Sequence, residues 1–164
     1  MRRLKLVGAA AALDADMVVA MAKPRRGKRP SDRARSSLRA FAKAADEAVS
    51  MREGGDWSAA TANHLVALYA WFHEQVYKVA DAELVDGRSF WKATAAADKL
   101  LRDEFGGESM RAVEYIAWCW VHERNKLKKP GTDPLKWRIT WQGQFVSRRL
   151  LTDYRIDLVR GRAQ

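Results

Sequence analysis

Residues 65–79, LVALYAWFHEQVYKV, carry the strongest periodic pattern in the sequence and decide the predicted fold class. Their large apolar side chains recur at steps of three and four residues, which places them along one face of an α-helix. The residues of this face are Leu65, Leu68, Tyr69, Phe72, Val76 and Val79. The pattern predicts an amphipathic helix that packs this face against a core.

Helix start and stop signals on both sides of this stretch predict four further helices. Serines suited to the N-cap position are found at Ser31, Ser89 and Ser109. Paired glycines at 54–55 and 106–107, and the pair Pro130-Gly131, mark helix ends. We expect helices over about 31–54, from Asp56 or Ser58 to 79–82, over 89–105, over 109–129, and from about Gln142 onward. Residues 137–141 alternate apolar and polar side chains, so a short extended piece there is an alternative.

The same periodicity predicts which side chains face the core. In the helix after Ser109, the expected inward residues are Met110, Val113, Ala117, Trp120 and Val121. The last helical region contains the apolar residues Trp137, Trp141, Phe145, Leu150, Leu151, Tyr154 and Leu158. Tryptophans at helical spacing usually belong to a core, and we expect this of Trp71, Trp91, Trp118 and Trp120. Cys119, the single cysteine, lies in the apolar run 116–121 and is expected to be a buried thiol.

Length and composition agree with one helical domain. The chain has 164 residues, of which 48% are hydrophobic and 30% are charged, as in globular proteins. Only 4 prolines and 10 glycines are present, few for a sandwich or barrel that is rich in turns. The sequence therefore predicts an all-α protein, a compact bundle of about five helices. Residues 1–30 are expected to be a basic, flexible N-terminal segment, and residues 31–164 the helical domain.

The net charge of +10 is unevenly distributed. Residues 1–43 hold 12 Lys/Arg against 3 Asp/Glu, residues 44–121 hold 7 against 13, and residues 122–164 hold 11 against 4. A basic head and a basic tail thus flank an acidic middle. Lysine and arginine near phosphates release condensed counterions, so this distribution favours a nucleic-acid partner. A solvated basic surface without a fixed partner is the alternative.

Three basic clusters are candidates for phosphate contact. The first is an arm between two prolines, with Lys23, Arg25, Arg26, Lys28 and Arg29. The second, Arg124, Lys126, Lys128 and Lys129, ends a predicted helix, where positive charge also complements the helix dipole. The third comprises Arg148, Arg149 and Arg155 on the last helix. On a helix, Arg148 and Arg155 share a face opposite Leu150 and Tyr154. A helix that faces the groove or backbone of a nucleic acid has this arrangement, and so does an ordinary helix face exposed to solvent.

Two tryptophans are candidates for stacking on unpaired bases. Trp137 and Trp141 lie beside Lys136 and Arg138, and aromatic rings next to basic side chains are typical of single-strand binding sites. We include these four residues in the predicted nucleic-acid site.

No catalytic or metal-binding motif is present in the sequence. GxSxG, GxGxxG, P-loop, CxxC and HExxH patterns are all absent. His73-Glu74 and His122-Glu123 stand on two predicted helices, but neither histidine has a glutamate three residues before it, as a di-metal bundle requires. We expect a protein without metal, cofactor or enzymatic activity.

The first residues allow two interpretations. Arg2-Arg3-Leu4-Lys5 and the apolar residues after it resemble a secretory signal, with Ala20-Met21-Ala22 as a cleavage site. Asp14 and Asp16 interrupt the apolar stretch, and translation from Met17 or Met21 would give an ordinary cytoplasmic start. We expect a cytoplasmic protein without a membrane span.

Four segments give the sequence a resemblance to small helical accessory proteins of phages and mobile elements. They are residues 65–77, 99–107 (KLLRDEFGG), 115–120 and 145–155, within a similar region that covers roughly 57–155. The resemblance implies a role in replication, packaging or regulation near DNA or RNA, and it carries over no functional residue.

These patterns predict a non-enzymatic nucleic-acid-binding accessory protein that contacts phosphates through its basic arm and its C-terminal helices. The alternative is a protein-binding module, a small subunit or inhibitor that docks onto a larger nucleoprotein complex. The acidic stretches 81–86 and 98–108 favour the alternative, because they would repel phosphate.

Overall fold

The computed structural model describes residues 32–85, 87, 89–127 and 138–161. They are largely helical and contain no strand, which confirms the predicted all-α class. The expected N-terminal arm lies outside the described residues.

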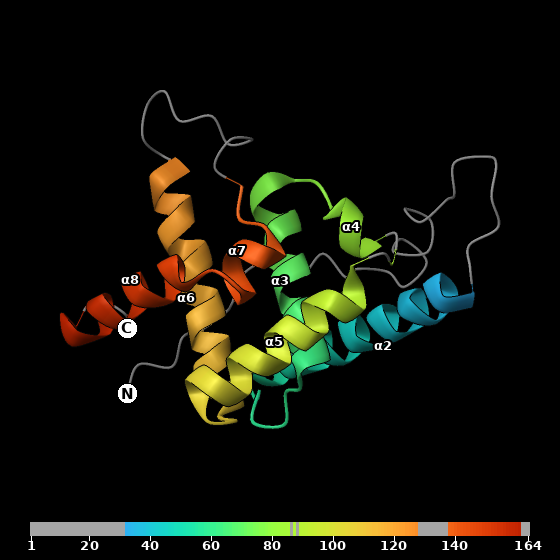
Figure 1. Cartoon of the computed structure of the whole chain (residues 1–164), viewed down its shortest axis with the longest axis horizontal. Helices are drawn as coiled ribbons and strands as arrows, with labels where there is room; N and C mark the ends of the chain where they lie inside the picture. The colour runs from blue at the N-terminus through green and yellow to red at the C-terminus, as the bar shows by residue number, and fades with distance from the viewer. Residues whose placement is uncertain (1–31, 86, 88, 128–137, 162–164) are drawn as a thin grey trace.

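Five helices of twelve or more residues make up most of the described chain (Figure 1). They are α2 (Asp32–Gly54), α3 (Ala62–Tyr77), α5 (Phe90–Phe105), α6 (Ser109–Leu127) and α8 (Arg148–Val159). Two short helices, α4 (Ala82–Val85) and α7 (Trp141–Phe145), lie between them. The long helices agree with the predicted bundle of about five.

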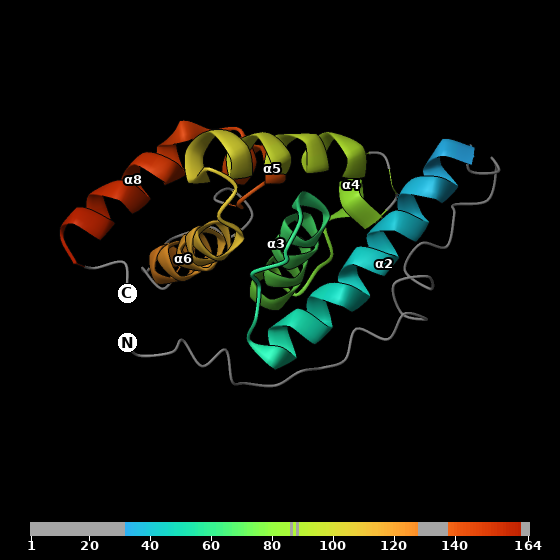
Figure 2. The same ribbon diagram turned by 90° about the horizontal axis from the view of Figure 1, so that it is seen from below.

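Helix α3, which contains the most periodic stretch of the sequence, lies at the centre of the bundle. It contacts α2, α5 and α6, and Figure 2 shows α2 and α6 on either side of it with α5 across the top. Helix α8 packs against α6 and α7. Because α3 has neighbours on several sides, Leu65, Val66 and Tyr69 have no exposed surface. The buried residues form one cluster that includes side chains from every described helix.

An aromatic group joins α3 to α6 within this core. Trp120 of α6 is buried against the rings of Tyr69, Phe72, His73 and Tyr77, all of α3. Aromatic pairs with tilted or edge-on rings stabilise a core beyond the area they bury. The predicted core position of Trp120 is therefore confirmed.

Helix α3 begins later than its predicted start at Asp56 or Ser58. Residues 57–60 form a turn in which the Ala60 N–H donates to the Trp57 carbonyl at 3.0 Å, and this turn buries the Trp57 ring. Thr61 is the N-cap, and its backbone N–H donates to Nδ1 of His64 at 3.0 Å. The burial of Trp57 in the core thus moves the start of α3 to a later residue than the local sequence signals predict.

The buried face of α6 differs from the prediction. Met110 and Val121 are exposed, although the periodicity placed them inward. Val113 and Trp120 are buried, as predicted, and Ala117 is partly buried. The core also receives four residues of α6 that the periodicity did not single out: Ala112, Tyr115, Ile116 and Cys119. Helix α6 contacts α3, α5 and α8, and these neighbours together select the side that is buried. Cys119 is buried, as predicted.

Two further core predictions are wrong, because the residues lie at the edges of the bundle. Trp91 is 41% exposed in the first turn of α5, and Val79 is exposed beyond the end of α3. Trp71 and Trp118 are partly buried and pack against the core.

Candidate nucleic-acid interface

The structure describes only part of the predicted nucleic-acid site. Outside the described residues lie Lys23, Arg25, Arg26, Lys28, Arg29, Lys128, Lys129, Lys136 and Trp137. Arg124 and Lys126 lie on the last turns of α6, and only their backbone is described. The remaining candidates are Arg138, Trp141, Arg148, Arg149 and Arg155, and the structure gives each a different environment.

Arg148 and Arg149 are exposed in the first turn of α8. Ser147 is the N-cap, and its hydroxyl oxygen accepts the Arg149 backbone N–H at 3.4 Å. The first turn contains no acidic residue. The N-terminal end of a helix carries partial positive charge, which favours anions and disfavours cations. Two guanidinium groups at this end therefore reinforce a positive potential that suits a phosphate.

Arg155 is exposed on α8 but already pairs with an acidic residue. Its Nη2 lies 2.7 Å from Oε2 of Glu104 on α5. This ion pair joins α5 and α8 through two residues that are 51 positions apart in the chain. A phosphate that contacts Arg155 would have to compete with the Glu104 carboxylate.

Arg138 is partly buried and packs on α3. Its guanidinium lies 5.4 Å from the centre of the Tyr77 ring, in cation–π geometry. The next residue, Ile139, donates its backbone N–H to the Tyr77 hydroxyl at 2.9 Å. The Tyr69 hydroxyl lies 3.1 Å from the Ile139 carbonyl and 2.8 Å from Oδ2 of Asp81. Arg138 therefore adjoins a polar network that holds Ile139 against α3.

The environment of Trp141 overturns its predicted role. Trp141 is 7% exposed and belongs to the hydrophobic core at the start of α7. A ring in this position cannot stack on a base, so the stacking prediction for Trp141 is wrong. Within this alternating stretch, Ile139 bonds to side chains of α3 rather than to a strand, and Thr140 caps the start of α7.

Carboxylates of the acidic middle lie next to arginines. On α5, Arg102 pairs with Asp98 at 3.4 Å and with Asp103 at 3.2 Å. At the start of α6, Arg111 pairs with Glu108 at 3.5 Å. These exposed pairs contribute little to stability, but they reduce the negative potential near α8. The acidic stretch 98–108 therefore repels phosphate less than its sequence suggests.

A second basic surface, which the sequence reasoning did not single out, lies on α2. Arg35, Arg39 and Lys43 are exposed and stand four residues apart, so they line one side of the helix. Successive members are about 6 Å apart along the helix axis, close to the rise of about 6.8 Å for two nucleotides of a B-DNA strand. We call these residues the α2 ridge. Their four-residue spacing was the signal that could have identified them.

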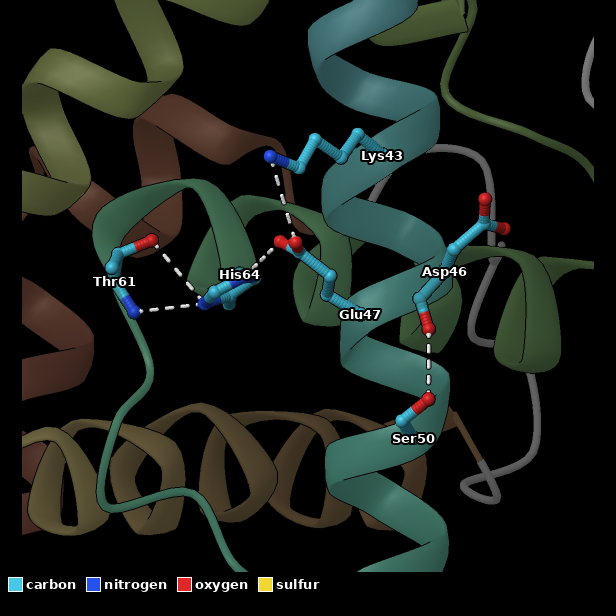
Figure 3. A network of polar contacts seen from close by, with 6 residues as sticks. All are labelled: Lys43, Asp46, Glu47, Ser50, Thr61 and His64. Atoms are coloured by element: carbon cyan, nitrogen blue, oxygen red, sulfur yellow. Dashed lines mark hydrogen bonds and ion pairs between the residues drawn. The ribbon is translucent and has the colours of Figure 1, made fainter.

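The α2 ridge adjoins a polar network between α2 and α3 (Figure 3). Nζ of Lys43 lies 3.8 Å from Oε1 of Glu47, and Oε2 of Glu47 lies 2.8 Å from Nε2 of His64. Since Nδ1 of His64 accepts the Thr61 backbone N–H, Nε2 carries the proton and donates it to Glu47. This hydrogen bond lowers the pKa of the Glu47 carboxyl below its ordinary value.

In the same network, the Thr61 hydroxyl, the His64 imidazole and the Glu47 carboxylate follow one another. Oγ1 of Thr61 lies 3.2 Å from Nδ1 of His64, an order that hydrolase triads share. A general base needs an available lone pair, and the Nδ1 lone pair already accepts the Thr61 backbone N–H. His64 therefore serves the start of α3 rather than the activation of a nucleophile.

The two basic surfaces lie far apart. Helix α2 lies at one end of the long axis of the molecule and α8 at the other, and both views agree on this (Figures 1 and 2). The fold thus separates the exposed basic residues of α2 from those of α8.

No protein-family model, curated protein or solved structure matches the chain. In the described part of the chain, no three histidine, cysteine or carboxylate side chains are grouped so that they could hold a metal ion. None of the described helices combines the length and the apolar character needed to cross a lipid bilayer.

Proposed function

We propose that the protein binds the phosphate backbone of DNA or RNA through two basic surfaces, the first turn of α8 and the α2 ridge. It acts without catalysis, as an accessory protein of nucleic-acid metabolism. The predicted arm at 23–29 precedes α2 in the chain and would extend the second surface.

One observation carries this proposal, the position of Arg148 and Arg149. Both side chains are exposed at the positive end of an α-helix, where an acidic side chain is the usual preference. A bound phosphate would make this arrangement favourable through charge-assisted hydrogen bonds. Residues 138–161 hold five arginines and two aspartates, so the surroundings are also positive.

Salt-dependent binding of the full-length protein tests the proposal. Fluorescence anisotropy with a labelled DNA duplex of about 20 base pairs and with a single-stranded RNA would be measured between about 50 and 200 mM salt. For B-DNA, the slope of log K against log salt is about −0.9 per phosphate contacted. We expect the double variant Arg148→Gln/Arg149→Gln to reduce the magnitude of this slope by roughly 1.8.

A second double variant that removes the same number of charges distinguishes direct phosphate contact from the general effect of net charge. Lys92 and Lys99 are exposed on α5 and belong to neither proposed surface, and Lys92→Gln/Lys99→Gln removes the same two charges. This control should keep nearly the slope of the unaltered protein. Equal slopes for the two double variants, or binding to neither nucleic acid at low salt, would overturn the proposal.

An apolar patch on α8 favours a second candidate function. Ile156, Leu158 and Val159 are exposed near the end of this helix, and Val159 is 91% exposed. Exposed apolar side chains beside arginines are common at protein interfaces, which suits a small subunit or inhibitor that docks onto a larger nucleoprotein complex. For this candidate, Val159→Asp would abolish co-purification with one host protein, and Arg148→Gln/Arg149→Gln would leave nucleic-acid binding unchanged.

A further inference from the structure

A small cavity lies between α2, α3 and the turn that joins them. Its volume is about 10 Å³, and Arg52, Trp57 and Trp71 line it together with alanine, valine and leucine side chains. A cavity of this volume has room for about one water-sized group. It cannot hold a phosphodiester, so it is separate from the proposed nucleic-acid surfaces.

Two buried hydrogen-bond donors at this cavity lack acceptors. Neither Nη2 of Arg52 nor Nε1 of Trp57 has a hydrogen-bond partner among the described residues. Trp57 is only 3% exposed, so its indole N–H cannot be solvated from the surface. The guanidinium of Arg52 lies 4.4 Å from the centre of the Trp71 ring, and this stacking holds it at the cavity. Buried donors without partners are rare and indicate an occupant.

The chemistry of the lining selects the kind of occupant. Arginine and tryptophan side chains only donate hydrogen bonds, and the other lining side chains are apolar. A water molecule could accept from both donors, but its own two hydrogens would find no side-chain acceptor in the lining. An anion accepts only, and it would also compensate the partly buried charge of Arg52. Burial lowers the pKa of this guanidinium, and the neighbouring Glu53 carboxylate acts in the opposite direction.

We propose that this cavity is a binding site for one halide-sized anion, held by the guanidinium of Arg52 and the indole N–H of Trp57. Among anions, a halide ion is the closest in size to a water molecule. The bound ion would join the C-terminal part of α2 to α3 through the Trp57 turn. This site does not depend on nucleic-acid binding, because Arg52 belongs to neither proposed basic surface.

Chloride NMR on the full-length protein tests the site directly. Exchange of ³⁵Cl⁻ with a protein site broadens the chloride line, and the broadening would be titrated with bromide as competitor. Trp57→Phe keeps an aromatic ring but removes the N–H donor, so we expect about tenfold weaker chloride binding or more, the loss of one hydrogen bond to a charged group.

The matched control is Trp120→Phe. Trp120 is also buried, and its Nε1 also lacks a partner in the described part of the chain, but it does not line the cavity. This variant should bind chloride as the unaltered protein does, which separates the cavity from weak binding to surface arginines. Equal chloride broadening for the unaltered protein and the Trp57→Phe variant would overturn the proposal.

A second measurement needs no variant. Crystals of the unaltered protein soaked in bromide should show an anomalous peak between Arg52 and Trp57. Water alone at this position, without an anomalous signal, would show that the donors have a neutral occupant and would contradict the halide site.

Discussion

His73 illustrates how a polar residue of α3 is used inside the core. It is 1% exposed and lies among the rings of Tyr69, Tyr77 and Trp120. Its Nδ1 donates a hydrogen bond to the Val79 carbonyl at 2.9 Å, which joins the end of α3 to the residues that follow it. The sequence pair His73-Glu74 carries side chains that can bind metals, whereas in the structure His73 packs among aromatic rings and donates this hydrogen bond.

Stability should therefore depend on pH through His73. Burial lowers the pKa of His73 below its ordinary 6.5, and the nearby Arg138 acts in the same direction, against opposing effects of Val79 and Asp81. The unfolded chain takes up the proton at a higher pH than the folded protein does. The contribution to stability is complete above pH 6.5 and is lost as the pH falls from 6.5 through the lowered folded value.

Urea unfolding near pH 7.5 and near pH 5.5 measures this dependence. We expect the free energy of unfolding to fall between the two conditions, and to fall less for His73→Gln. His64 and His122 are unchanged in both proteins, so the difference isolates His73. An equal fall in the two proteins would show that His73 does not titrate differently in the folded state.

Gly87, in the connection between α4 and α5, packs closely against α2. Gly87 has a φ of +74° and lies against α2, where an added Cβ would stand 3.0 Å from the Ala34 carbonyl oxygen. Gly55, after α2, also has a positive φ, +68°, but an added Cβ would meet nothing within 4 Å. The two glycines thus share a backbone requirement and differ in their surroundings.

Alanine substitutions at these two positions separate backbone strain from close contact. We expect Gly55→Ala to lower the free energy of unfolding by about 1–2 kcal/mol, the penalty for a left-handed conformation. Gly87→Ala should cost at least about 1 kcal/mol more, because α2 would have to shift away from the new methyl group. Urea denaturation of both variants measures the difference, and equal losses would contradict the close approach of this connection to α2.

Helix ends were predictable where the chain carries its own stop signals. Gly106 ends α5 with a φ of +60°, and the Gly107 N–H bonds to the Leu101 carbonyl at 2.9 Å, a local C-capping arrangement that the glycine pair indicates by itself. The start of α3 and the buried face of α6 were not predictable in this way. They depend on where Trp57 packs and on the helices that surround α6, which periodicity within one helix does not report.

The candidate site was predictable in composition but not in geometry. Exposed arginines on α8 were expected, and the four-residue spacing on α2 was available in the sequence. The ion pair between Arg155 and Glu104 joins distant segments, and the burial of Trp141 follows from the placement of α7 in the core. Such relations appear only once the helices are arranged in space.

At the scale of the whole molecule, the fold keeps the two described basic surfaces at opposite ends of its long axis (Figures 1 and 2). Between them lie α3, which forms the centre of the core, and α5, whose acidic side chains pair with Arg102 and Arg155. This arrangement places positive potential at two separate positions of one molecule.

Because Cys119 is completely buried, its reaction with a thiol reagent measures the global opening of the protein. The only thiol of the chain lies on α6 at 0% exposure, within the cluster shared by every described helix. A thiol reagent can reach it only when α6 separates from its neighbours, so labelling measures the population of open molecules. We expect the labelling rate to increase with urea as steeply as equilibrium unfolding does. A much shallower dependence would mean that α6 detaches while the remaining helices stay packed.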